Sequence, residues 1–202
     1  TLGENEINFT PPWKRMTMAE AIKKYANIHV DKMSDIELKN FLEKNNLKLK
    51  TEFRRGVAIE EIFSELVQPK LIQPTIIYDY PSDTSPLAKH KEGNKNIVER
   101  FEPIINGWEL GNNYTELNDP QKLKEAFLEQ SEFMKKGDEE AAPYDKDFVN
   151  ALEVGMPPTS GLGLGVDRLI MLLTNQPSIR DVIFFPFMKP LDSKTNNNDT
   201  SH

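Results

Sequence analysis

Residues 98–117 read VERFEPIINGWELGNNYTEL, and they decide how the middle of the chain folds. Two runs rich in apolar residues, 98–105 and 108–117, flank Asn106-Gly107. This dipeptide favours a two-residue hairpin turn because both of its residues tolerate positive φ. The stretch therefore predicts two antiparallel strands that meet at Asn106-Gly107.

Two acidic side chains share one face of this hairpin. Ile104 faces Glu109 in the simple register, and Glu102 lies two residues from Ile104 on the same side of its strand. Two carboxylates repel each other unless a cation lies between them, and Mg²⁺ that also binds phosphate oxygens meets that need. We interpret the pair as a candidate magnesium and nucleotide site; the alternative is a solvated polar face. Pro103 opposite Leu110 has no N–H for the ladder, which indicates a longer loop or an edge strand.

A second polar set follows the turn. Asn112, Tyr114 and Glu116 alternate and so share one face, which offers an amide, a ring and an acid to an amine. A carboxylate attracts an ammonium by roughly 4 kcal/mol at ~4 Å and an effective dielectric of about 20, before desolvation. By parity this face is opposite to that of Glu109, so a shared pocket needs a bulge, for which 111–113 is the candidate. The alternative is ordinary alternation on a half-buried strand.

A glycine-rich segment near the carboxyl end, residues 161–168, reads GLGLGVDR. Its three glycines, Gly161, Gly163 and Gly165, allow a ligand close to the backbone, and the helix predicted after them offers N–H groups to an anion. Arg168, one turn into that helix, has a forked cationic side chain suited to phosphate oxygens. The G-x-G-x-G spacing lacks the context of a dinucleotide fingerprint. The alternative is a closely packed glycine strand beneath a helix.

The other segments predict helices around the central strands. Capping boxes of Thr17 with Glu20 and of Ser34 with Glu37 open two helices, and an apolar stripe forms a third. The expected helices are 18–26, 35–45, 59–67, 120–136 and 146–155, and the expected further strands are 75–80 and 182–185. The stretch 161–173 is expected to form a strand, then a turn, then a helix. Residues 1–15 are expected to be extended, 82–96 to be a mobile loop and 193–202 to be disordered.

Composition narrows the range of functions. The chain has 202 residues, with 25 Lys and Arg, 32 Asp and Glu, and no Cys, which excludes a disulfide scaffold, a thiolate zinc site and a Cys nucleophile. Its pI of about 5.1 argues against binding nucleic acid by bulk charge, so any RNA contact must be local or made by a part of the protein outside these residues. The sequence has no apolar run of about 20 residues and no signal peptide at its start, and we expect a cytoplasmic protein without a membrane partner.

Taken together, these segments resemble the C-terminal part of the catalytic domain of class II lysyl-tRNA synthetases, over about residues 8–190. The strings that carry the resemblance are TPPWKRMT at 10–17, SPLAK at 85–89, RFE at 100–102, WELGN at 108–112, YTELNDP at 114–120, GDEEA at 137–141, ALEVGMPPT at 151–159, GLGLGVDR at 161–168 and IRDVI at 179–183. The segment 161–168 corresponds to the third signature of class II and names only the class, whereas several other strings are typical of the lysine enzymes.

The resemblance implies an α+β fold in which an antiparallel sheet is flanked by helices. The implied boundaries are 1–190 for part of the catalytic domain, with a helical segment at about 17–70 and the sheet with the active-site signatures at 74–190, and 191–202 for a disordered tail. It also implies a reaction in which lysine attacks the α-phosphate of ATP to give lysyl adenylate, and the lysyl group then passes to tRNA(Lys). Such a site acts by positioning and charge stabilisation, without a protein nucleophile.

Roles for individual residues follow from the same resemblance. Glu102 and Glu109 would bind Mg²⁺ and position ATP, Arg168 would bind the γ-phosphate side of ATP, and these three would be the catalytic residues. The implied lysine-binding residues are Asn112, Tyr114, Glu116, Gly161 and Gly163, and the implied ATP-binding residues are Glu102, Glu109, Gly165 and Arg168. Glu116 would meet the substrate ammonium.

Parts of the family pattern are missing from these residues. The family has an N-terminal anticodon-binding barrel, a first signature used in dimerisation and a second that carries an arginine for the α-phosphate. We therefore expect a piece of a homodimeric enzyme that is weakly active or inactive alone. One alternative is a non-catalytic synthetase-like module that binds an amino acid or a protein, and another is a paralogue that attaches lysine to a protein. The presence of Glu102, Glu109, Glu116 and Arg168 favours the ligase.

Overall fold

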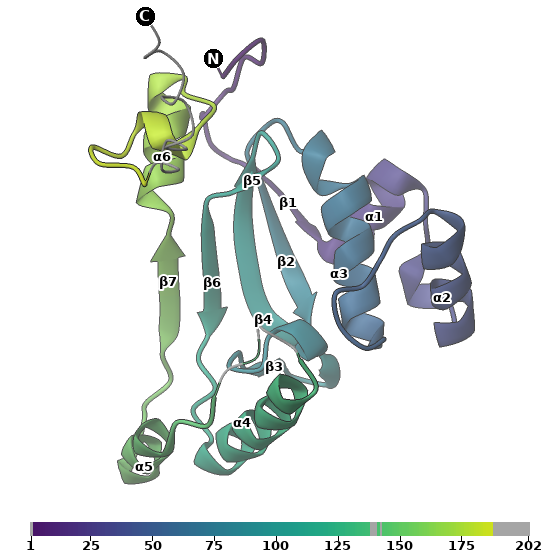
Figure 1. Cartoon of the computed structure of the whole chain (residues 1–202), viewed down its shortest axis with the longest axis vertical. Coiled ribbons are helices and arrows are strands. Elements are labelled where there is room, and N and C mark those ends of the chain that lie inside the picture. Colours follow the sequence, from purple (N-terminus) through teal and green to yellow (C-terminus); the bar gives the residue numbers. More distant parts are fainter. Residues whose placement is uncertain (1, 138–140, 142, 188–202) are drawn as a thin grey trace, which may run out of the picture.

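A seven-stranded sheet forms the centre of the computed structural model, which describes residues 2–137, 141 and 143–187 (Figure 1). The strands are β1 Lys14–Thr17, β2 Thr75–Pro81, β3 His90–Lys91, β4 Asn94–Ile105, β5 Trp108–Glu109, β6 Gly111–Thr115 and β7 Ser160–Leu164. Their order across the sheet is β1-β2-β4-β6-β7, and β3 and β5 also pair with β4. The long strand β4 is therefore the centre on which the hairpin is built.

The sheet is antiparallel except at one edge. The pairs β2·β4, β4·β6 and β6·β7 are antiparallel, as expected, whereas β1 lies parallel to β2. We predicted only an extended segment there, so this strand was missed. Parallel strands need a long crossover between them, and the three helices that follow β1 supply it.

In the part of the chain that the structure describes, six α-helices lie around the sheet: α1 Met18–Ala26, α2 Asp35–Lys44, α3 Arg55–Leu66, α4 Pro120–Lys135, α5 Lys146–Val154 and α6 Val166–Thr174. Short 3₁₀ turns lie at η1 Val30–Lys32, η2 Gln68–Lys70, η3 Ser82–Thr84 and η4 Ile179–Asp181. Both predicted capping boxes are confirmed, with Thr17 and Ser34 each accepting the N–H of the glutamate three residues later. Helix α3 begins four residues before the predicted stripe, at Arg55. None of the helices in the described residues is both long and apolar enough to cross a membrane.

The main core lies between the first three helices and one face of the sheet, on the right in Figure 1. Ile22 of α1 and Ile62 and Phe63 of α3 are buried against Ile77 of β2 and Ile104 of β4. Each fully buried side chain of this size contributes about 1.5–3 kcal/mol. This packing fixes α3 above the sheet face that also carries Glu102, because residues 102 and 104 point to the same side of β4.

Helix α6 is fixed by a smaller cluster at the opposite side of the sheet. Leu172 of α6 packs with Ile105, Leu110 and the N-terminal Leu2. The first residues are tied there as well, since the backbone N–H of Gly3 donates to Oδ1 of Asn175 at 2.8 Å. The start of the described chain and the C-terminal end of α6 therefore meet beside the hairpin, where Asn5 also donates to Oδ1 of Asn106.

Two predictions about irregular and extended segments are wrong. The stretch 82–96 is not a continuous loop, because Gly93 at φ +76° turns the chain and lets β3 pair with the first residues of β4. Residues 182–185 form no strand: Phe184 and Phe185 are 95% and 92% exposed, and β-propensity without a neighbouring strand to pair with does not make one. The tail predicted at 191–202 lies outside the described residues.

Candidate active site

The hairpin turn has the predicted form. Asn106 and Gly107 have φ of 53° and 74°, and Ile104 pairs with Glu109 across the turn. Pro103 does not lie on an edge strand, since β4 is central. The N–H that Pro103 lacks leaves the carbonyl of Leu110 open to another donor, and the N–H of Gly165 fills it at 2.8 Å. The proline thus helps to attach the glycine-rich segment to the hairpin.

The pairing of the hairpin slips by one residue beyond the turn. Two residues separate Phe101 from Ile104 on β4, whereas three separate Glu109 from Asn113, their partners. The extra residue is a bulge among 110–112, one position before the stretch that we predicted. Because a one-residue slip moves side chains to the other face, the parity conflict in the sequence disappears.

The bulge brings both polar sets to one face of the sheet. Arg100 pairs with Tyr114, and its Nε donates to Oδ1 of Asn112 at 3.0 Å. Glu102 lies on the same side of β4 as Arg100, and Glu109 on the same side as Ile104. The carboxylates and the amide-and-ring set therefore line one surface, below α3.

Glu102 is buried, and each of its two carboxylate oxygens accepts one hydrogen bond. It is 6% exposed, its Oε2 accepts the hydroxyl of Tyr80 at 2.6 Å, and its Oε1 accepts a short bond from Nη2 of Arg100. Burial and the neighbouring Glu102 raise the pKa of the Tyr80 hydroxyl well above its usual value. Tyr80 therefore stays a hydrogen-bond donor and holds the carboxylate in one orientation.

Glu109 is half-buried beside Arg168. Nη1 of Arg168 donates to the backbone carbonyl of Glu109 at 2.6 Å and lies 3.8 Å from its Oε2. Burial raises the pKa of the Glu109 carboxyl, and repulsion from Glu102 raises it further. The predicted pair of acids is thus close enough to interact, and a cation between them would relieve the repulsion.

These residues fit a magnesium ion that arrives with a nucleotide better than a metal held by protein alone. Among the residues that the structure describes, no three His, Cys, Asp or Glu side chains could hold a metal ion together. Protein-bound Mg²⁺ commonly takes one or two carboxylates and completes its shell with water and phosphate oxygens. Glu102 and Glu109 are a donor set of that kind.

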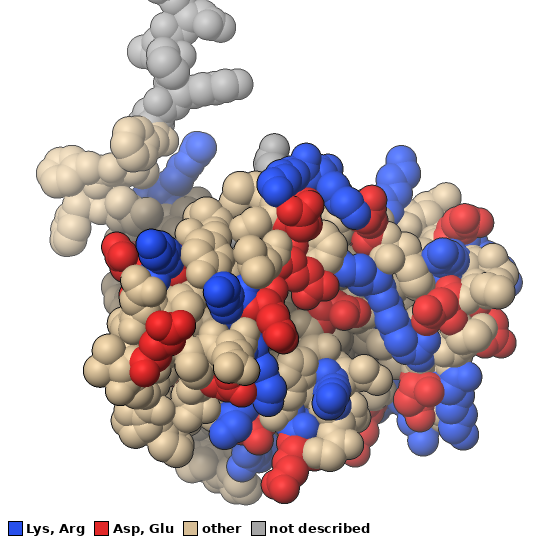
Figure 2. Space-filling model, turned by 90° about the horizontal axis from the view of Figure 1, so that it is seen from below, with Lys and Arg blue, Asp and Glu red and all other residues tan. Residues whose placement is uncertain are grey.

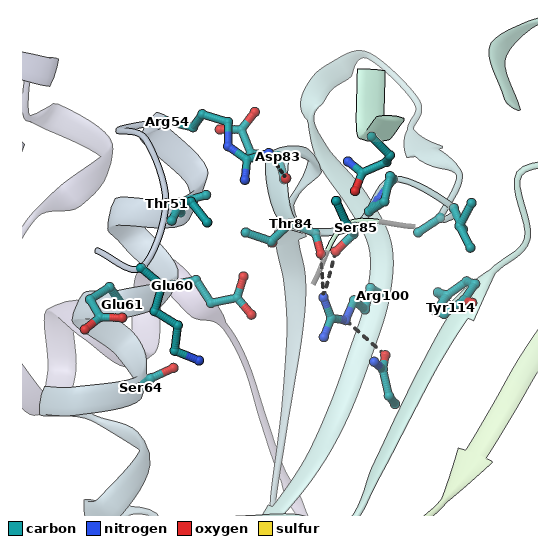
Figure 3. A pocket seen from close by; sticks show the side chains of 18 residues that line it. Thr51, Arg54, Glu60, Glu61, Ser64, Asp83, Thr84, Ser85, Arg100 and Tyr114 are labelled. Atoms are coloured by element: carbon teal, nitrogen blue, oxygen red, sulfur yellow. Dashed lines mark hydrogen bonds between the residues drawn. The ribbon is translucent and has the colours of Figure 1, made fainter. Parts of the chain in front are cut away.

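A cavity of about 500 Å³ opens between α3 and this face of the sheet (Figure 3). Asn112 and Tyr114 line it from the sheet, Glu60 and Glu61 from α3, and the segment 83–88 from above. In Figure 3, Arg100 points from β4 toward Thr84 and Ser85, between the two walls. Of the predicted site residues only Asn112 and Tyr114 line this cavity in the described part of the chain; the carboxylates of Glu102, Glu109 and Glu116 and the three glycines are not among its lining residues.

Glu116 and the glycines meet at the next strand. Gly161 pairs with Tyr114 and Gly163 with Asn112, so both glycines lie beside residues that the sequence predicts to bind lysine. Burial raises the pKa of the Glu116 carboxyl. A Cβ at Gly163 would lie 2.9 Å from the carbonyl of Asn112, so the glycines permit close packing, as the alternative hypothesis for this segment held.

The predicted strand, turn and helix of the glycine-rich segment are confirmed. Strand β7 leads through Gly165 into α6, and Gly165 has no side-chain cap to offer. Arg168 is exposed and Gly163 is exposed, so this end of the site is open to solvent. Figure 2 looks at the molecule from below the view of Figure 1, where α4 and α5 lie, and shows acidic and basic side chains interspersed over that lower face.

Comparison with known proteins decides the family. A family model for class II tRNA synthetases (D, K and N) matches residues 1–189. The chain belongs to the class II tRNA synthetases.

Within this class, the chain is similar to curated lysine–tRNA ligases. The chain is 52% identical over 186 residues to a lysine–tRNA ligase of Thermoanaerobacter sp. (strain X514), an alignment that covers 92% of this chain and 37% of the relative. It is 49% identical over 187 residues to that of Saccharolobus solfataricus, covering 92% and 38%. It is 48% identical over 189 residues to that of Porphyromonas gingivalis, covering 94% and 33%. The chain spans about a third of the length of these relatives.

Two residues of the site in this class II synthetase chain, Arg100 and Tyr80, were not predicted from the sequence. Arg100 lies two residues before Glu102, and period-two alternation alone places the two side chains on one face. That signal was available in the sequence. Tyr80 could not be found in the same way, because its contact with Glu102 joins strands that are 22 residues apart in the chain.

Proposed function

We propose that this chain forms part of the active site of a lysine–tRNA ligase. In the first step the carboxylate of L-lysine attacks the α-phosphate of ATP, giving lysyl adenylate and pyrophosphate; in the second, the lysyl group passes to tRNA(Lys). The single observation that carries the proposal is the one-residue bulge among 110–112, which puts Glu102 and Glu109 on the same face as Asn112 and Tyr114. An amino acid and a nucleotide bound on that face would lie side by side.

Lysine would bind on the cavity side. Glu116 would accept the substrate ammonium, and Asn112 and Tyr114 would line the pocket, with Gly161 and Gly163 beside them. Arg100 donates to Oδ1 of Asn112, so the amide N–H₂ of Asn112 is left to donate to the substrate. Glu116 is only partly buried, and a partly desolvated carboxylate binds an ammonium more strongly than a fully exposed one, provided that the pair is hydrogen-bonded.

ATP would bind on the hairpin side. Arg168 would bind the γ-phosphate side, with Gly165 next to it at the start of α6, and Glu102 and Glu109 would hold Mg²⁺. The metal would neutralise phosphate oxygens as charge develops on the leaving pyrophosphate. The protein side chains position the two substrates, which is sufficient for acyl-adenylate formation because no protein nucleophile is needed.

The proposed enzyme is a homodimer that works in the cytoplasm, with tRNA as the acceptor. The curated relatives are about three times as long as the matched segment, so a complete test needs the remaining sequence. A suitable protein is the Thermoanaerobacter ligase in which the aligned segment is replaced by this chain, here termed the chimera.

The test is lysine-dependent exchange of labelled pyrophosphate into ATP in the presence of Mg²⁺. We expect exchange by the chimera with lysine and none with arginine, and little or none by the 202-residue chain alone. Glu116→Gln in the chimera should abolish most of the lysine-dependent signal. A chimera that folds and dimerises but stays silent with lysine would indicate a synthetase-like binding module instead.

A further inference from the structure

One side chain connects the two halves of the site. Arg100 donates through Nη2 to Oε1 of Glu102 and through Nε to Oδ1 of Asn112. Its Nη1 donates to Oγ of Ser85 at 2.8 Å and to the carbonyl of Thr84 at 3.4 Å (Figure 3). Four bonds from one planar group leave the guanidinium almost no freedom to move without moving its partners.

Tyr80 supports this group from β2. Its ring lies 4.4 Å from the Arg100 guanidinium carbon, and its hydroxyl donates to Oε2 of Glu102. Tyr80 is 1% exposed, so ring and hydroxyl are fixed by the core. The guanidinium is thereby held on one side by an aromatic ring and at its edges by hydrogen bonds.

The partners of Arg100 belong to different subsites of the proposed enzyme. Glu102 belongs to the Mg²⁺ and ATP side, Asn112 to the lysine side, and Ser85 to the segment that closes the cavity. Arg100 lines the cavity, and its hydrogen bonds go to protein groups that belong to these separate parts of the site. It therefore acts through these residues.

We propose that Arg100 is a positioning residue that couples lysine binding to Mg·ATP binding. The inference rests on the proposed function. Glu102 would share its Oε1 between Arg100 and bound Mg²⁺, so the position of the guanidinium would depend on whether Mg·ATP is bound. The guanidinium in turn orients Asn112, because arginine can only donate and the amide oxygen of Asn112 must therefore face it. Because such coupling is a free energy shared by two sites, lysine must also strengthen nucleotide binding by the same factor.

The coupling is measured as the ratio of lysine dissociation constants without and with Mg²⁺ and a nonhydrolysable ATP analogue, by calorimetric titration of the chimera. The wild-type chimera should show a ratio of about fivefold or more. Arg100→Lys keeps the charge and loses the fork, and it should reduce the ratio to about one while lysine still binds. Tyr80→Phe keeps the ring, removes the hydroxyl bond to Glu102, and should reduce the ratio in part.

Arg55→Lys is the matched control. Arg55 also makes several bonds, to Oδ1 of Asp35 and to the carbonyls of Val30 and Met33, but it lies outside the cavity lining. It should lower thermal stability and leave the coupling ratio unchanged. If Arg100→Lys fails to fold, Tyr80→Phe carries the test, because it deletes a single oxygen atom.

The outcomes separate this inference from the function beneath it. If the wild-type chimera binds both lysine and the ATP analogue but its coupling ratio is near one, the coupling is wrong and the proposed ligase function still stands. The coupling is also wrong if Arg100→Lys loses stability but retains the wild-type coupling ratio. If Arg100→Lys does not fold, the same result with Tyr80→Phe leads to the same conclusion. A wild-type chimera that binds neither lysine nor the analogue overturns the proposed function, and the inference with it.

Discussion

A Cβ atom placed on Gly161 would lie 2.3 Å from Oε1 of Glu116. The glycine is therefore the reason that this carboxylate can lie where it does, against the backbone of β7. The same strand passes equally close to Gly111, where an added Cβ would meet the carbonyl oxygen of Gly163, also at 2.3 Å. The two glycines differ in what they leave room for: a flexible side-chain end at Gly161 and a fixed backbone atom at Gly111.

Gly161→Ala should impair lysine binding more than stability. The Glu116 carboxylate can rotate away at a cost of about 1 kcal/mol or less, but it then leaves the substrate ammonium, and lysine affinity in the chimera should fall about tenfold. Gly111→Ala cannot be relieved by a rotamer change and should destabilise the fold by about 2 kcal/mol or more. Thermal unfolding and lysine titration of both variants test this contrast. Equal losses of stability would show that Glu116 is not the group that yields.

Glu116→Gln should weaken lysine binding much more than ATP binding. The substitution keeps size and hydrogen-bonding capacity and removes the charge, so the loss should match a charge-assisted bond, about 1.5–3 kcal/mol or roughly tenfold to a hundredfold in the lysine dissociation constant. The dissociation constant of the ATP analogue should change by less than about threefold. Parallel titrations of the chimera measure both, and similar losses for both ligands would contradict the assigned role.

As the pH falls, lysine binding should begin to weaken at a higher pH than it would with a glutamate of ordinary pKa. Burial raises the pKa of Glu116, so its carboxyl becomes neutral at a higher pH than usual, and only the ionised form attracts the ammonium. Affinity is therefore full above the raised pKa and falls as the pH drops through it. Tyr114, whose pKa is also raised, stays neutral throughout this range. Titrations between about pH 5 and pH 8 should show the decline in wild type and its absence in Glu116→Gln.

Arg168→Ala should reduce nucleotide affinity and spare lysine. The variant removes the proposed phosphate contact. It also releases Glu109, because Arg168 contacts both the backbone carbonyl and the carboxylate of that residue. We expect about a tenfold or greater loss in affinity for the ATP analogue with Mg²⁺, measured in the chimera, and a lysine dissociation constant within about twofold of wild type. A selective loss of lysine affinity would place Arg168 in the wrong subsite. Lys122→Ala, a surface substitution with a 3.6 Å ion pair to Asp119 on the exposed start of α4, is a suitable charge control.

Much of the local structure could be predicted because it depends on neighbours in the chain. The capping boxes of α1 and α2, the Asp119 cap of α4 and the Asn106-Gly107 turn are each set by residues two to four positions apart. The wrong predictions concern strands, whose formation depends on a neighbouring strand to pair with. Residues 182–185 have strand-forming side chains but no strand, whereas the polar residues 90–91 form β3 because β4 lies beside them.

The sequence by itself determined the hairpin, the helices and the residue types of the candidate site, since periodicity and turn chemistry act over short distances. It also determined that a bulge was needed for one shared pocket. Only the tertiary structure decided that Glu102 is held by Tyr80 and Arg100, that Glu116 lies over Gly161, and that Leu110 accepts from Gly165. These contacts join segments that are brought together by sheet order and core packing, which no spacing along the chain specifies.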